Sequence, residues 1–119
     1  DVLLDTFPYP GGTTTVEALW MGVPTLTYAT PGMIGRQGEG ILKNVGLSDW
    51  VCQTVDEYIE KAVSLAQGKQ LGEKSLTELR ENLREICESS PAANPKMMVK
   101  NLEQILLKMW DTLCNQKGI

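Results

Sequence analysis

The first thirty or so residues alternate short apolar runs with glycine and proline, a pattern that predicts a βαβ unit. Val2-Leu3-Leu4 is a continuous apolar run between two aspartates, typical of a strand buried on both faces of a parallel sheet. From Thr13 the apolar positions follow helical spacing until Gly22 and Pro24 end the helix. Residues 25–28 have the composition of a second strand, so we expect a parallel pair joined by a right-handed crossover.

The rest of the chain is dominated by helical patterns. A short apolar link at Trp50-Val51 could form a third small strand. Capping boxes at Thr54–Glu57 and Ser75–Glu78 each predict a helix start, because their hydroxyl and carboxylate groups satisfy free backbone N–H groups. Asn94-Pro95 predicts an N-cap followed by proline at the first helical position. The apolar stripe from Met98 to Leu113 indicates a long final helix that packs back across the domain.

Together these patterns predict an α/β fold with few parallel strands followed by several C-terminal helices. Residues 1–53 are expected to form a partial Rossmann-like unit, and residues 54–119 the helical part of the same domain. Trp20, Trp50 and Trp110 fall in apolar patterns, so we expect them in the core. Because a central strand rarely opens a complete domain, we expect a piece of a longer protein. Its truncated sheet predicts exposed apolar surface and possible self-association.

Composition narrows the class of protein. The 119 residues are 42% hydrophobic and 22% charged, which is ordinary for a soluble globular domain. A formal charge of −4 argues against nucleic-acid binding, which needs a basic surface. The apolar runs are too short to span a bilayer, and the first residues lack the features of a signal peptide. We therefore expect a cytoplasmic protein with neither a nucleic-acid nor a membrane partner.

The residue types exclude several kinds of catalytic and metal site. Cys52, Cys87 and Cys114 are widely spaced, which predicts reduced thiols and fits neither a disulfide framework nor paired metal ligands. The chain has no histidine, which excludes Ser-His-Asp and Cys-His nucleophiles and histidine-based metal sites within it. It also has no Asp-x-Asp metal motif. We therefore expect no metal cofactor, and any acid–base catalysis must use carboxylates or groups from outside this chain.

The candidate for binding chemistry is the glycine-rich turn and the helix start that follows it. Two glycines let the backbone approach a ligand, while the free N–H groups, the helix dipole and threonine hydroxyls suit a diphosphate. Glu17 lies one helical turn after Thr13, where its carboxylate could accept hydrogen bonds from both hydroxyls of a ribose. The alternative is an ordinary threonine N-cap on a helix that binds nothing. The candidate residues are Gly11, Gly12, Thr13, Thr14, Thr15 and Glu17.

A family resemblance supports the binding interpretation. The stretch DVLLDTFPYPGGTTTVEALWMGVPTLT, residues 1–27, resembles the C-terminal catalytic region of O-GlcNAc transferase-like proteins. The resemblance continues through Gly46-Leu47, the helix around Tyr58, Ser89-Ser90-Pro91 and Met109-Trp110, so it covers nearly the whole chain. These proteins are tetratricopeptide-linked glycosyltransferases with a two-lobed GT-B fold. The resemblance therefore implies a glycosyltransferase and, for this chain, the C-terminal portion of a Rossmann-like GT-B lobe.

The resemblance also implies roles for single residues. In that family the matching turn binds UDP-GlcNAc, which assigns Gly12, Thr13 and Thr14 to phosphate or ribose contacts and Glu17 to the ribose hydroxyls. Animal members have a histidine at the position of Gly12, and the glycine resembles the bacterial form of the motif. The glycine leaves backbone N–H groups to do the work of that side chain. Arg36 aligns with a family arginine and faces either the donor site, the other lobe or solvent.

The other parts of such a transferase would lie upstream of this chain. By resemblance, these parts are a lysine near the diphosphate, the base-recognition segment and the acceptor-facing lobe. The resemblance therefore implies no catalytic residue within this chain, which is expected to be inactive alone. In the full protein a sugar would pass from a UDP-sugar to a protein hydroxyl. Asp5 is expected to shape the turn by accepting N–H bonds, with a catalytic base as the alternative. Two other functions stay open, a non-catalytic helical interaction domain and a GT-B transferase with another nucleotide sugar.

Overall fold

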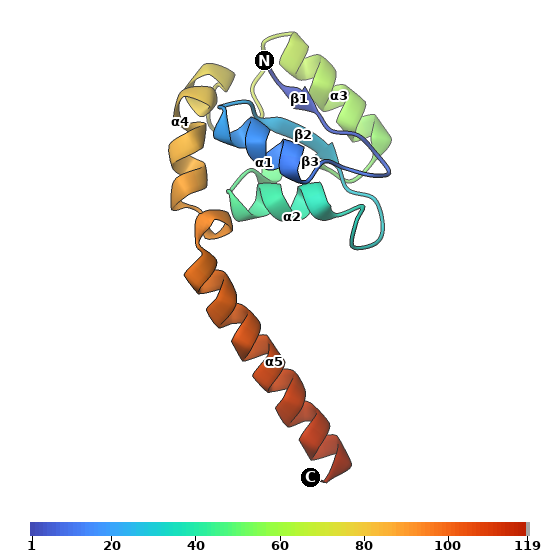
Figure 1. The fold of residues 1–119 in the computed structure, drawn as a ribbon. Coiled ribbons are helices and arrows are strands. Elements are labelled where there is room, and N and C mark those ends of the chain that lie inside the picture. Colours follow the sequence, from blue (N-terminus) through green and yellow to red (C-terminus); the bar gives the residue numbers. More distant parts are fainter. Residues whose placement is uncertain (119) are drawn as a thin grey trace.

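Three short parallel strands form the centre of the fold (Figure 1). The computed structural model describes residues 1–118. In it, Leu3 pairs with Thr25 and Thr27 pairs with Val51, so the second strand lies between the other two. The strands lie in the order β1 (Leu3–Leu4), β2 (Thr25–Tyr28) and β3 (Val51–Cys52). The predicted α/β class with few parallel strands is confirmed.

Helices cover both faces of this sheet. Helices α1 and α2 lie on one face, α3 lies on the other, and α4 packs against α1 (Figure 1). The helices are α1 (Thr13–Trp20), α2 (Gln37–Asn44), α3 (Val55–Ala66), α4 (Leu76–Ser89) and α5 (Pro95–Lys117), with 3-10 segments at Ser48–Trp50 and Pro91–Ala93. The predicted succession of a βαβ unit and C-terminal helices is therefore observed.

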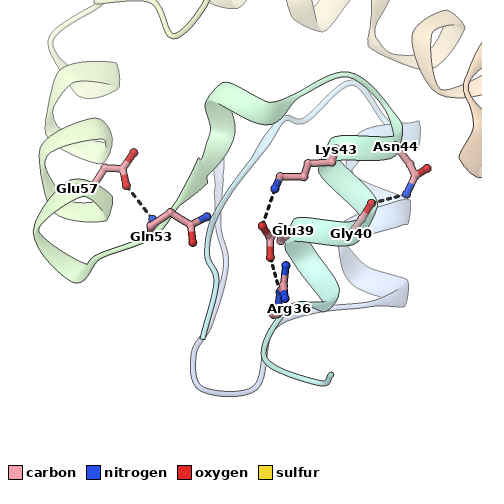
Figure 2. Close-up of polar contacts among 7 residues, drawn as sticks. All are labelled: Arg36, Glu39, Gly40, Lys43, Asn44, Gln53 and Glu57. Atoms are coloured by element: carbon pink, nitrogen blue, oxygen red, sulfur yellow. Dashed lines mark hydrogen bonds and ion pairs between the residues drawn. The ribbon is translucent and has the colours of Figure 1, made fainter. Parts of the chain in front are cut away.

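The helix starts follow the capping signals in the sequence. The Glu57 carboxylate accepts a hydrogen bond from the Gln53 N–H at 2.7 Å (Figure 2). The Thr54 hydroxyl accepts one from the Glu57 N–H at 3.1 Å. Ser75 and Asn94 accept backbone N–H bonds in the same way at the starts of α4 and α5. Each such cap contributes about 1 kcal/mol to helix stability, which explains why these boundaries were predictable.

One hydrophobic core joins the strands to the first four helices. Leu26 and Cys52 of the sheet and Leu83 of α4 are fully buried in it, so the helical region shares the core of the strands. Its other buried members are Leu19, Leu42, Val45, Leu47, Trp50, Val51, Leu65, Leu79 and Cys87. All three cysteines are free, as predicted. Burial raises the pKa of the Cys52 thiol to about 11, so this thiol is inert at neutral pH.

The structure corrects two expectations about burial. The first strand is an edge strand with a neighbour on one side, and Leu4 is 52% exposed, so it is not buried on both faces. Trp50 is in the core, but Trp20 is 37% exposed beneath the Arg84 guanidinium, and Trp110 is 62% exposed. The exposed strand edge agrees with the prediction of uncovered apolar surface.

Helix α5 extends away from the body instead of packing back across it (Figure 1). None of its described residues is buried, and most of its large apolar side chains, including Leu102, Leu106 and Met109, are at least half exposed. The radius of gyration is 17.2 Å, whereas a compact domain of this length has about 13.5 Å. The prediction that the stripe covers the domain is wrong, since within residues 1–118 the helix packs mainly against the adjacent 3-10 segment Pro91–Ala93. No helix in this described part combines the length and hydropathy that crossing a membrane requires.

Candidate functional site

The candidate turn lies at the edge of the sheet where the parallel strands end. Loops 5–12 and 29–36 follow β1 and β2, and helices α1 and α2 begin directly after these loops. Because parallel strands end at the same edge, the two helix starts lie next to each other. This edge is where open α/β sheets bind ligands.

Asp5 is the organising residue of this edge. Its side chain is buried, and Oδ1 accepts hydrogen bonds from the Gly11 N–H at 2.7 Å and the Thr6 N–H at 3.0 Å. Oδ2 accepts a hydrogen bond from the Thr27 hydroxyl of β2 at 2.7 Å. On the other side, the Tyr58 hydroxyl donates to the Asp5 carbonyl oxygen at 2.9 Å. The carboxylate therefore fixes the turn to the sheet, which confirms its predicted role in shaping the loop.

The start of α2 is pressed against the same carboxylate. A Cβ at Gly38 would overlap the Thr27 hydroxyl oxygen and would lie 2.8 Å from Asp5 Oδ2. Gly11 is similarly close, since a Cβ there would lie 2.9 Å from the Thr15 hydroxyl oxygen. The two glycines therefore allow both helix starts to approach the carboxylate, and they fix the distance between these starts.

A pair of glycines on α2 tests this close approach. We expect Gly38→Ala to lower the free energy of unfolding by about 1–3 kcal/mol, because the new methyl group overlaps Thr27 and Asp5. Gly40→Ala is the matched control, since nothing lies near a Cβ there and alanine is about 1 kcal/mol better than glycine inside a helix. Urea unfolding followed by circular dichroism measures both. Equal stabilisation of the two variants would show that Gly38 is not in close contact.

A cavity of about 390 Å³ opens beside the turn, within the range of small-molecule sites. The start of α1 borders it, and the N–H groups of its first turn lack intrahelical acceptors, as in any helix. Gly12 caps this helix without a side chain, so these N–H groups are accessible. The lining residues are Thr6, Tyr9, Pro10, Gly11, Gly12, Thr13, Thr14 and Gln37. The arrangement suits an anion that accepts several N–H and hydroxyl bonds.

The predicted site residues fall into three groups. Gly11, Gly12, Thr13 and Thr14 line the cavity together. Thr15 differs from expectation: its side chain is fully buried, and its hydroxyl donates to the Gly11 carbonyl oxygen at 3.0 Å. Its hydroxyl therefore cannot also face a ligand, because a helical threonine readily bonds the carbonyl four residues earlier. Thr15 is absent from the residues that line the cavity.

Glu17 and Arg36 lie outside the cavity lining. Glu17 is exposed one turn along α1, and its predicted contact with a ribose stays a prediction. The side chain of Arg36 is 64% exposed and forms a 2.8 Å ion pair with Glu39 of α2. No lysine or arginine lines the cavity within residues 1–118, so backbone and hydroxyl dipoles dominate its electrostatics.

Gln37 lines the cavity and was missed by sequence reasoning. It is the first residue of α2, and its side chain lies over Gly12. No motif or periodicity marks it. The available signal was its position directly after the loop of the second strand, where residues face the carboxyl edge of the sheet.

Glu39 of α2 pairs with two cations, Arg36 and Lys43 (Figure 2). Its buried carboxylate accepts hydrogen bonds from the Lys43 ammonium at 2.7 Å and the Arg36 guanidinium at 2.8 Å. The bonds to Lys43 and Arg36 hold the pKa of the Glu39 carboxyl below its ordinary value of 4.5. This cluster orients the start of α2 and engages Arg36.

The lowered pKa of Glu39 predicts acid sensitivity. Because the folded state favours the carboxylate, Glu39 stabilises the fold above pH 4.5, and this contribution is lost as the pH falls below that value. We expect Glu39→Gln to lower the free energy of unfolding at pH 7 by about 1–2 kcal/mol and to flatten its decline in acid. Urea unfolding at pH 7 and pH 3.5 measures this, with Glu60→Gln, an exposed residue of α3, as control. An unchanged pH dependence in Glu39→Gln would contradict the assignment.

A larger hollow of about 800 Å³ runs along α5, far from the sheet edge. It is an apolar surface of one extended helix, lined by residues such as Leu106 and Trp110, and few polar groups converge on it. It does not suit a nucleotide. Within residues 1–118, histidine, cysteine and carboxylate side chains form no cluster that could hold a metal ion.

Comparisons with known proteins agree on one family. The family model described as glycosyl transferase family 41 matches residues 1–102. The chain is 41% identical over 115 residues to a tomato protein, Solanum lycopersicum SPINDLY, named a probable UDP-N-acetylglucosamine–peptide N-acetylglucosaminyltransferase. It is 36% identical over 116 residues to the Arabidopsis thaliana protein SEC, which has the same enzyme name. The named relatives come from plants, so the bacterial form suggested by Gly12 stays a prediction.

A solved structure shows the same fold. It is a mutant O-GlcNAc transferase from Thermobaculum terrenum, with a TM-score of 0.76 and 39% identity. The match covers 97% of this chain and 21% of that chain. The tomato and Arabidopsis matches cover 97% of this chain but 12% of each relative, so the chain spans about an eighth of the relatives' length. The predicted C-terminal portion of a GT-B lobe is thereby confirmed.

Proposed function

Because the chain belongs to glycosyl transferase family 41, we propose that it supplies the donor-diphosphate site of a glycosyltransferase. The donor is a UDP-sugar, with UDP-GlcNAc as the first candidate because the tomato and Arabidopsis relatives are named for that donor. The observation that carries the proposal is the cavity at the start of α1, where Thr13 and Thr14 stand beside free N–H groups. The acceptor in this proposal is a serine or threonine hydroxyl of another protein.

The proposed chemistry follows from the position of these donors. When the sugar leaves, negative charge develops on the UDP diphosphate. In this proposal, the N–H groups of the first turn of α1 and the hydroxyls of Thr13 and Thr14, which line the cavity, donate hydrogen bonds to that charge and stabilise it. The positive end of the α1 dipole adds to this effect. In this proposal Glu17 binds the ribose and Arg36 approaches the donor from the start of α2.

The site needs further groups to complete it. No lysine or arginine lines the cavity in the described part of the chain, whereas a diphosphate carries at least two negative charges. We propose that a longer protein supplies these cations, the base-recognition segment and the acceptor-facing lobe, so the chain alone is inactive. We also propose that donor binding needs no metal ion, which chelation with EDTA tests. The division into residues 1–53 and 54–119 and a cytoplasmic location stay predictions.

A transfer assay tests this function. Full-length protein that contains this chain is incubated with a panel of labelled UDP-sugars and a protein extract, and label on proteins is counted. We expect transfer from UDP-GlcNAc that alkaline β-elimination removes from serine and threonine. Transfer from a different UDP-sugar alone would show that UDP-GlcNAc is not the donor. No transfer from any donor would overturn the proposal.

The exposed helix α5 favours a second function, self-association through its apolar side chains. We expect the 119-residue chain to form dimers or larger species at micromolar concentrations. The reason is that monomeric proteins rarely expose a contiguous apolar stripe such as that of α5. Sedimentation velocity measures this, with Leu106→Lys combined with Met109→Lys to break the contact. Ile59→Lys removes an equally exposed apolar residue from α3 as control. A monomer at all concentrations would contradict this expectation.

A further inference from the structure

Gln37 is placed to act on whatever occupies the cavity. It begins α2, its side chain borders the cavity, and its carboxamide forms no hydrogen bond with another residue within 1–118. Nε2 lies over Gly12, so closely that a Cβ at Gly12 would overlap it. The carboxamide nitrogen therefore occupies the space that a side chain at position 12 would fill.

The backbone that carries this side chain packs against the sheet. Gly38 lets the first turn of α2 rest against Asp5 and Thr27, and Asp5 also holds the Gly11 N–H. The backbone segments at Gly11 and Gln37 therefore both pack against the buried carboxylate of Asp5. The carboxamide lies near Gly12 because these two backbone segments approach each other closely.

We propose that the Gln37 carboxamide donates a hydrogen bond from Nε2 to the donor diphosphate. It thereby supplies the side-chain donor that Gly12 itself lacks. This inference rests on the proposed donor site and adds a residue to it. The chemistry is consistent, since Nε2 carries two hydrogens and the neighbouring groups at Thr13 and Thr14 are also donors. A shared oxyanion can accept from all of them.

The pairing of Gly12 with Gln37 also predicts how the two positions depend on each other. A methyl group at Gly12 must displace the carboxamide, which lies at the end of a flexible side chain. Gly12→Ala is therefore expected to weaken UDP binding by removing the Gln37 contact. Once Gln37 is alanine, the same change at position 12 should have little further effect on affinity.

Calorimetric titration of the full-length protein with UDP tests the inference. We expect Gln37→Ala to weaken UDP binding about tenfold, the usual effect of losing one hydrogen bond to a charged group. Gln37→Glu should weaken it further, because it places a carboxylate against the diphosphate. Thermal unfolding should show both variants folded, since Gln37 is exposed. Gln67→Ala, an exposed glutamine at the end of α3, is the control and should bind like the wild type.

The outcomes separate this inference from the proposed function. If the wild-type protein and Gln37→Ala bind UDP equally, the role of Gln37 is overturned while the donor site stands. If Gln37→Ala weakens uridine binding as much as UDP binding, the contact is to the nucleoside and the diphosphate assignment is overturned. If the wild-type protein binds no UDP, the proposed function fails first. Additive effects of Gly12→Ala and Gln37→Ala would contradict the predicted pairing.

Discussion

Asp5→Ala is expected to lower the free energy of unfolding by about 3 kcal/mol and to abolish measurable UDP binding. The change removes the acceptor for the Gly11 and Thr6 N–H groups and for the Thr27 hydroxyl, and the Asp5 side chain is only slightly exposed. Loss of the carboxylate therefore leaves three donors without a partner in a poorly solvated place. The turn then loses its connection to β2, and the donor groups at the start of α1 lose their alignment.

Two further variants make this result specific. Asp5→Asn keeps one oxygen that can accept from the Gly11 N–H, so we expect it to lose less stability than the alanine variant. Asp111→Ala removes an exposed carboxylate from α5 and should leave both properties unchanged. Urea unfolding and UDP titration are measured on all three. Wild-type UDP affinity in Asp5→Ala would show that the turn does not depend on this carboxylate.

Thr14→Glu is expected to weaken UDP binding about 100-fold without destabilising the fold. Thr14 is exposed at the second position of α1 and lines the cavity, so a carboxylate there faces the diphosphate directly. Two like charges at about 4 Å repel by up to about 4 kcal/mol near a protein surface, and partial solvation leaves roughly 2–3 kcal/mol. The same carboxylate interacts favourably with the helix dipole, which raises stability by about 0.3–1 kcal/mol.

The matched control is Thr77→Glu. Thr77 is exposed at the second position of α4, so it gains the same dipole stabilisation, but it lies away from the cavity. We expect its thermal stability to rise as in Thr14→Glu while its UDP affinity stays at the wild-type value. Equal UDP affinity in the two variants would place the diphosphate elsewhere. The pair separates binding from folding because both variants should gain stability, whereas only Thr14→Glu should lose UDP affinity.

The local elements were predictable because their signals lie within a few residues of each other. The caps at Thr54, Ser75 and Asn94 and the stop at Gly22 each need only a short segment to act, and the observed helices begin and end there. The second strand at residues 25–28 was also predicted with its observed bounds. The turn of Asp5 followed the same rule, since its N–H partners are at most six residues away.

The features that were missed depend on contacts between distant segments. Gln37 reaches Gly12 only because Gly38 packs against β2, and no periodicity in the sequence records that approach. The apolar stripe correctly predicted helix α5 but not its packing. Amphipathic spacing shows that a helix face is apolar, but it does not show what covers that face. The burial of the Thr15 hydroxyl was missed because a helical threonine can bond either to a ligand or to its own backbone.

The central claim is that the N–H groups at the start of α1 bind the donor diphosphate. Hydrogen–deuterium exchange of the full-length protein, measured by mass spectrometry with and without saturating UDP, reports on these N–H groups directly. We predict slower exchange with UDP in peptides that cover residues 6–20 and 33–42, and no change across residues 55–66 of α3. UDP binding confirmed by calorimetry, with unchanged exchange across residues 6–20, would contradict the account.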